Sequence, residues 1–275
     1  MCYLDCLQLC NLHSILLILG PHCLHQSHLL RLGLIEFWII SGSLTELKVI
    51  YNSITDAISQ LLHNVDIPTM KATFGMGCFW SVDSLFGATI GVVRTRVGYS
   101  GGTTKNPHYR DMGDHTEVIE LDYDPKTVTY DELLDMFWAN HEYGLTTKLK
   151  RQYQSLILYH NEEQKRAAEA SYKETQIRTQ EQLRTEIAPA GHFYPAEDYH
   201  QKYRLQGHKD LCRELGLNAS NLQTSHLAAR LNGYLVGVGG KAQFELEVKK
   251  LGLSEKQAEY VRRELERNAG GGLAC

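Results

Sequence analysis

The order of apolar and polar residues in the central part of the chain predicts a series of β-strands. In residues 93–97 β-branched residues alternate with arginines, and in residues 119–123 apolar residues alternate with acidic ones. Such alternation has the period of a strand with one exposed face. Two shorter segments, residues 155–159 and 185–188, predict further strands in the same region.

Helical spacing occupies the intervals between these strands. Apolar residues recur three and four positions apart in residues 82–86, the spacing of one helix face. Thr129 and Glu132 form a capping box ahead of an amphipathic helix. Asn161 caps a long charged helix, and Pro195 is expected in the first turn of another.

The resulting order, strand–helix–strand–strand–helix–strand, is typical of an α+β domain whose helices pack on a mainly antiparallel sheet. We place this domain at residues 70–207. Residues 208–275 are expected to form a small helical C-terminal extension. Its short helices are predicted at residues 227–231, 244–251 and 254–268, and its glycine-rich tail ends at Cys275.

The first 69 residues differ from the rest and have no role that their sequence reveals. Two apolar runs, residues 15–19 and 32–40, are too short or too interrupted to span a bilayer. Asp5 precedes the first run and no Lys or Arg does, which argues against a secretory signal. This leader could be disordered, or translation could begin at Met70.

Composition narrows the function classes. The chain has 275 residues, 43% hydrophobic and 22% charged, as in ordinary globular proteins. Its net charge of -4 and the lack of a basic cluster argue against nucleic-acid binding. The seven cysteines are an odd number without a CxxC pair, which favours a reducing compartment and single reactive thiols over a disulfide framework or metal site.

One of these cysteines lies where a strand should turn sharply into a helix. A β-prone run breaks at Gly75 and Gly77, and the helical spacing starts directly after Cys78. A helix N-terminus favours an anion and lowers a thiol pKa, so Cys78 is a candidate nucleophile. Phe79 and Trp80 would give it an apolar pocket. The alternative from these residues alone is a buried structural cysteine.

The segment Gly77-Cys78-Phe79-Trp80 resembles the signature of the A-type methionine sulfoxide reductases, the peptide-methionine (S)-S-oxide reductases. Further segments resemble that family in the family's own order, so that the resemblance covers residues 71–207. These segments are residues 97–102, 106–110, 114–118, 137–141, 151–155 and 193–201.

The resemblance implies a ferredoxin-like split βαβ core and a cofactor-free enzyme. It implies thiol-dependent reduction of methionine S-sulfoxide, protein-bound and free, with thioredoxin as the reductant. Cys78 would be the nucleophile, Glu117 the proton donor, and Tyr109 and Tyr153 donors to the sulfoxide oxygen. The expected substrate-binding residues are Phe79, Trp80, Glu142 and Tyr194.

The chain departs from the family pattern in two places. Residues 143–150 are basic and lack the family's glycine-rich run, and Leu235 stands where many members have a resolving cysteine. The resemblance therefore leaves the second thiol to be found elsewhere. We expect Cys275 on its flexible tail; Cys212, or direct reduction by a small thiol, are the alternatives.

Two other functions are open at this point. A peroxide-reducing thiol enzyme would have no use for the aromatic pair beside Cys78, because peroxide has no methyl group to accommodate. A non-catalytic module that binds oxidised methionine would explain the missing resolving cysteine. We expect a cytoplasmic monomer, with a mitochondrial or membrane-associated location through the leader as the alternative.

Overall fold

The structure is a computed structural model, and it describes residues 67–141 and 145–269. Two predicted site residues, Glu142 and Cys275, lie outside these ranges, as does the leader up to residue 66. No helix among the described residues is long and apolar enough to cross a membrane.

A six-stranded sheet forms the centre of the domain, in the order β5-β4-β1-β3-β2-β6. All neighbours are antiparallel except β4 and β5. β1 and β2 run parallel on either side of β3 and are joined through α4, which is the split βαβ arrangement. The predicted α+β fold is confirmed. The strands are Met70–Met76 (β1), Val92–Ser100 (β2), Thr116–Tyr123 (β3), Ser155–Tyr159 (β4), Glu186–Pro189 (β5) and Tyr194–Pro195 (β6).

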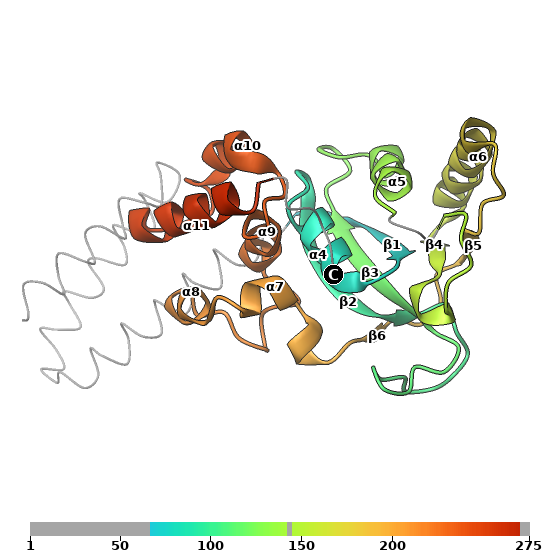
Figure 1. The fold of residues 1–275 in the computed structure, drawn as a ribbon, viewed down its shortest axis with the longest axis horizontal. Helices are drawn as coiled ribbons and strands as arrows, with labels where there is room; N and C mark the ends of the chain where they lie inside the picture. Colours follow the sequence, from blue (N-terminus) through green and yellow to red (C-terminus); the bar gives the residue numbers. More distant parts are fainter. Residues whose placement is uncertain (1–66, 142–144, 270–275) are drawn as a thin grey trace, which may run out of the picture. The chain divides into compact units, whose positions relative to one another are not determined.

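Helices on one side of the sheet and beyond its edge make up most of the remaining described residues (Figure 1). The predicted N-caps Thr129 and Asn161, and also Ser254, all accept a backbone N–H at the start of their helices. The helices are Phe79–Gly87 (α4), Tyr130–Ala139 (α5), Glu162–Thr179 (α6), Tyr203–Gln206 (α7), Lys209–Glu214 (α8), His226–Tyr234 (α9), Gly240–Glu247 (α10) and Glu255–Arg267 (α11), with 3-10 turns at Arg151–Tyr153 (η2) and Asp198–His200 (η3).

The main core lies between the sheet and helices α4 and α5. Phe74, fully buried on β1, has its ring 5.6 Å from that of Phe86 on α4 and 5.4 Å from that of Phe137 on α5. Both helices therefore bury their apolar faces against the same strand, as their spacing predicted.

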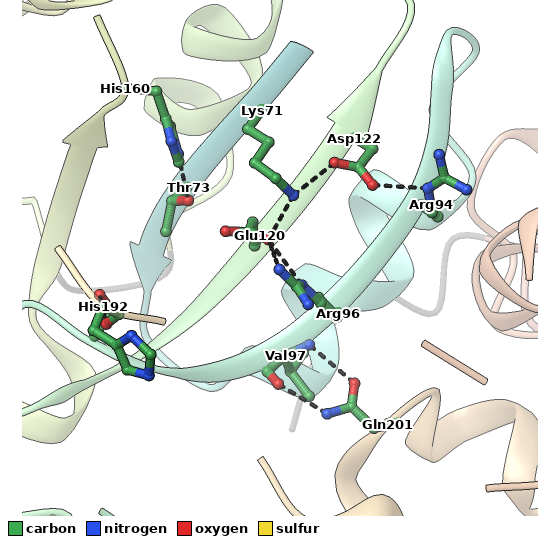
Figure 2. Close-up of polar contacts among 11 residues, drawn as sticks. Lys71, Thr73, Arg94, Arg96, Val97, Glu120, Asp122, His160, His192 and Gln201 are labelled. Atoms are coloured by element: carbon green, nitrogen blue, oxygen red, sulfur yellow. Dashed lines mark hydrogen bonds and ion pairs between the residues drawn. The ribbon is translucent and has the colours of Figure 1, made fainter. Parts of the chain in front are cut away.

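The opposite face of the sheet carries a group of charged side chains on β1, β2 and β3, besides a small apolar cluster around Leu156 on β4. Lys71 on β1 lies 2.9 Å from both Glu120 and Asp122 on β3, and Arg94 and Arg96 on β2 pair with the same two acids (Figure 2). These are the polar positions of the predicted alternation. The pairs are cross-strand neighbours, so they favour the observed register.

The prediction for Pro195 is wrong. This residue lies in β6 opposite Gly98 of β2 and opens no helix; the next helical turn is η3. A proline is tolerated here because β6 is the edge strand of the sheet, where no N–H is needed for a further neighbour. The pairing of β6 with β2 joins residues far apart in sequence, so a local sequence pattern could not predict this strand.

The C-terminal helices build a second core of their own. Leucines and aromatic residues of α7 to α11 form it, with Tyr234 and Phe244 fully buried. Figure 1 shows these helices gathered beside α4. The contact is close: a Cβ built on Gly87 of α4 would lie 2.4 Å from the carbonyl oxygen of Ala229 on α9.

Candidate active site

Cys78 lies at the turn between β1 and α4, as the sequence predicted. Gly77 has φ +86°, a conformation that favours glycine, and Cys78 follows as the N-cap residue of α4. The thiol is half-buried, and α4 has no acidic side chain in its first turn. The N-terminal end of the helix therefore presents its partial positive charge to the sulfur, which favours the thiolate.

Glu117 near the start of β3 reaches the same helix end. Its side chain is 2% exposed, and its Oε2 accepts the backbone N–H of Phe79 at 3.1 Å. Its other oxygen, Oε1, accepts the side-chain amide of Gln152 at 2.7 Å. The predicted proton donor is thus a buried carboxyl group, bonded to the residue that follows the candidate nucleophile.

Tyr109 and Tyr153 lie together beside these two residues. Burial raises the pKa of Tyr109 above its ordinary value, and negative charge on Glu117 and Cys78 raises it further, while a hydrogen bond with Tyr153 acts in the opposite direction. The phenol of Tyr109 therefore keeps its proton at neutral pH. The structure brings the two predicted phenol donors within hydrogen-bond reach of each other at the site.

An aromatic wall adjoins the site. The indole of Trp80 stacks on Tyr203 with ring centroids 3.8 Å apart, and its N–H donates to Nδ1 of His200 at 3.0 Å. The ring of His200 also lies 5.0 Å from that of Phe79 and 4.6 Å from that of Tyr109. Phe79 and Trp80 thus have the positions expected for an apolar wall.

The tautomer of His200 follows from this contact. An indole N–H can only donate, so Nδ1 of His200 accepts and Nε2 carries the proton. Burial lowers the pKa of His200, while the charge of Glu197 acts the other way. The imidazole is therefore neutral and adds no charge to the wall.

Glu197 holds two tyrosines of the site in place by hydrogen bonds, a role that was not predicted from the sequence. It accepts the hydroxyl of Tyr99 at 2.8 Å and the backbone N–H of Tyr109 at 3.0 Å. Burial alone would raise the pKa of Glu197, but these donors outweigh it and the pKa is lowered. An ionised Glu197 therefore fixes the backbone of Tyr109.

Gln152 and His200 were missed as well. Both lie inside segments that resembled the family, at residues 151–155 and 193–201, and this was the only signal available. Tyr194, predicted to bind substrate, packs at the edge of the cluster around Phe79, with its ring 4.3 Å from His192.

The described residues contain two cysteines, Cys78 and Cys212. Cys212 on α8 packs against the helical core, its thiol donates to the carbonyl of Leu205 at 3.3 Å, and burial raises its pKa. Leu235, where the family pattern places a cysteine, directly follows α9 and is 1% exposed in the same core. Neither position resembles the environment of an attacking thiolate.

The arrangement suits attack on a polarised sulfur atom. Cys78 can supply a thiolate, Glu117 a proton, and Tyr109 and Tyr153 neutral donors to a departing oxygen. The described residues hold no cluster of three or more His, Cys, Asp or Glu that could bind a metal ion.

Two family models match the described chain, and their ranges overlap at residues 216–229. The sequence model described as peptide methionine sulfoxide reductase matches residues 70–229. A second, described as selenoprotein methionine sulfoxide reductase A, helical domain, matches residues 216–266.

Two individual relatives give the same result. The chain is 55% identical to a peptide methionine sulfoxide reductase of Drosophila melanogaster, over 84% of this chain and 95% of the relative. It is 38% identical to peptide methionine sulfoxide reductase A5 of Arabidopsis thaliana, over 74% and 82% respectively. Among solved structures, methionine sulfoxide reductase A of Corynebacterium diphtheriae matches with a TM-score of 0.47 and 33% identity, over 51% of this chain and 76% of that one.

Proposed function

Because the chain belongs to the peptide methionine sulfoxide reductase family, we propose that it reduces the S epimer of methionine sulfoxide, protein-bound and free, to methionine. The observation that carries this proposal is the joint placement of Cys78 and Glu117 at one helix end. Cys78 is the N-cap residue of α4, and the next backbone N–H, that of Phe79, donates to the carboxyl group of Glu117.

In the reaction, the thiolate of Cys78 attacks the sulfoxide sulfur while Glu117 donates a proton to the oxygen. The phenols of Tyr109 and Tyr153 hold that oxygen as its charge develops. With a second proton from solvent, the sulfur–oxygen bond of the substrate breaks, water leaves, and Cys78 is bonded through its sulfur to the substrate sulfur as a sulfonium. Water then attacks the Cys78 sulfur and gives a proton to solvent. The bond between the two sulfur atoms breaks with its electron pair on the substrate, so the thioether is released and Cys78 is left as a sulfenic acid.

Turnover needs a second thiol. Its thiolate attacks the sulfenic sulfur, water leaves, and a disulfide forms that an external dithiol reduces. We assign this role to Cys275, which lies outside the described residues, because the buried Cys212 has a raised pKa. Thioredoxin is the external dithiol that the family resemblance suggests, and a cytoplasmic monomer fits such a reducing partner.

The test is the release of methionine from each free sulfoxide epimer with dithiothreitol as reductant. We expect turnover of the S epimer alone, and none by the Cys78→Ser variant. A Cys212→Ser variant, matched in chemistry, should retain the parent rate. Comparable turnover of both epimers, or activity that survives Cys78→Ser, would contradict the proposed function.

A further inference from the structure

Two N–H groups hold the carboxyl group of Glu117, one at each oxygen. The backbone N–H of Phe79 donates to Oε2 at 3.1 Å, and the side-chain amide of Gln152 donates to Oε1 at 2.7 Å. Glu117 itself is 2% exposed. In so buried a position, the energy of each of these bonds depends strongly on the charge of the carboxyl group.

A donor directed at a carboxyl oxygen bonds the ionised form more strongly than the neutral one. Hydrogen bonds to a charged acceptor are roughly twice as strong as those between neutral groups. As a proton donor, Glu117 begins the chemical step neutral and ends it as a carboxylate. The bond from Gln152 therefore strengthens while the proton leaves, which is the kind of contact that lowers a reaction barrier.

The backbone around Gln152 is fixed relative to β3. Gln152 lies in the middle of the 3-10 turn η2, next to Tyr153. The hydroxyl of Thr116, the residue before Glu117, donates to the carbonyl of Arg151 at 2.9 Å. The guanidinium of Arg151 donates in turn to the carbonyl of Asp114 at 3.0 Å. These bonds hold the turn against the strand that carries Glu117.

We infer that Gln152 is a positioning residue that orients Glu117 and stabilises the carboxylate formed as Glu117 gives up its proton. This inference rests on the proposed function, because it concerns the proton donor of that reaction. It assigns to η2 a second role besides supplying the phenol of Tyr153.

The test combines two substitutions in a double-mutant cycle. Gln152→Met keeps the length of the side chain and removes the donor. We expect the single-turnover rate with methionine S-sulfoxide to fall about 10- to 100-fold, with the substrate concentration at half-maximal rate within about twofold of the parent. In a Glu117→Gln background the same substitution should change the rate by less than about twofold, because no carboxylate forms there.

Gln154→Met is the matched control. Gln154 follows the same turn and is also half-buried, but its amide donates to the carbonyl of Arg184 at 2.7 Å. We expect the parent rate from this variant. Thermal unfolding of all variants shows whether each remains folded at the assay temperature.

Three results would overturn the inference. The first is a parent rate in Gln152→Met, and the second is an equal loss in both backgrounds, which indicates a general structural effect. The third is a parent chain that releases no methionine, which overturns the proposed function together with this inference. An active parent with a parent-like Gln152→Met variant overturns the inference alone.

Discussion

The two ends of helix α4 differ in how their backbone groups are used. At the N-terminal end, Cys78 is half-buried and the N–H of Phe79 reaches the carboxyl group of Glu117. At the C-terminal end, Arg230 of α9 donates to the carbonyls of Gly87 at 3.1 Å and Thr89 at 2.6 Å. The N-terminal end of α4 directs its partial positive charge at reacting groups, whereas the carbonyls at the C-terminal end are bonded by the buried guanidinium of Arg230.

The middle of the helix is also held by buried polar contacts. Asp83 lies 3.2 Å from the ammonium group of Lys202, and both side chains are buried. Asn232 of α9 donates to the hydroxyl of Ser84 at 3.2 Å. The helical extension, through α9, therefore anchors α4, and the nucleophile Cys78 lies at the opposite, N-terminal end of that helix. Changes at the N-terminal end should therefore affect the rate, and changes at the C-terminal end the stability.

The largest effect is expected at the N-terminal end. Glu117→Gln keeps the shape of the side chain and removes the acid, so the rate should fall by about two to four orders of magnitude. The free energy of unfolding should change little, because the amide still fills the site. Steady-state rates and denaturant unfolding of the variant measure both quantities.

Glu120→Gln is the control, since it removes the same charge from the same strand, where Glu120 pairs with Lys71 and Arg96 on the opposite face of the sheet. Its rate should stay within about twofold of the parent. A Glu117→Gln rate within a few-fold of the parent at neutral pH would remove Glu117 from the mechanism.

At the C-terminal end, Arg230→Met should reverse the pattern. Arg230 is fully buried and pairs with Glu247, so its loss removes the cation that faces this acid and a donor to the carbonyls of Gly87 and Thr89. We expect the free energy of unfolding to fall by about 3 kcal/mol. The rate per folded molecule should change less than about threefold, because no reacting group is touched.

Arg213→Met removes an exposed arginine of the same extension, whose partner is Asp210, and should cost less than about 1 kcal/mol. If Arg230→Met abolished turnover while remaining folded, the division between the two ends of α4 would be wrong.

A smaller loss of stability is expected from Gly233→Ala. A Cβ at Gly233 would lie 2.4 Å from the Cβ of Ala88 and from the carbonyl oxygen of Ser84. Overpacking of this kind costs about 1 to 3 kcal/mol, more than the helix propensity gained. Gly191→Ala, where no atom lies within 4 Å of the new Cβ, should leave the free energy of unfolding unchanged. Urea unfolding of both variants measures this difference. Equal stability of the two variants would show that α9 can move away from α4.

The smallest effect concerns pH. His141, after α5, bonds the carbonyl of Phe137 at 2.7 Å and the hydroxyl of Ser155 at 2.9 Å. Burial lowers the pKa of His141 to about 4, against the opposing effect of the Phe137 carbonyl. His141 therefore binds a proton at a lower pH in the folded chain than in the unfolded chain. The stability that the neutral His141 contributes is fully present above about pH 6.5 and is lost as the pH falls toward 4.

Between pH 7.5 and 5.5 this histidine should account for about 1 kcal/mol of lost stability. His141→Gln should flatten the pH dependence of the free energy of unfolding by that amount. An unchanged dependence would show that His141 titrates alike in both states.

Much of the fold could be predicted because its signals are local. The alternation in residues 93–97 and 119–123 became β2 and β3, and the glycines around Cys78 correctly placed this residue at a helix start. The support for the site could not be predicted in this way. Gln152 and His200 act through contacts with residues 35 and 120 positions away, and single polar residues have no periodic pattern.

The most direct test asks which cysteine is oxidised when one methionine sulfoxide is reduced. The reduced chain receives one equivalent of methionine S-sulfoxide without reductant, and released methionine and the state of each cysteine are measured by mass spectrometry after alkylation. We predict one methionine per chain and the loss of the Cys78 thiol, through a sulfenic acid to a disulfide with Cys275. Methionine release with Cys78 still a free thiol, or release by Cys78→Ser, would contradict the central claim that α4 presents the nucleophile at its N-terminal end.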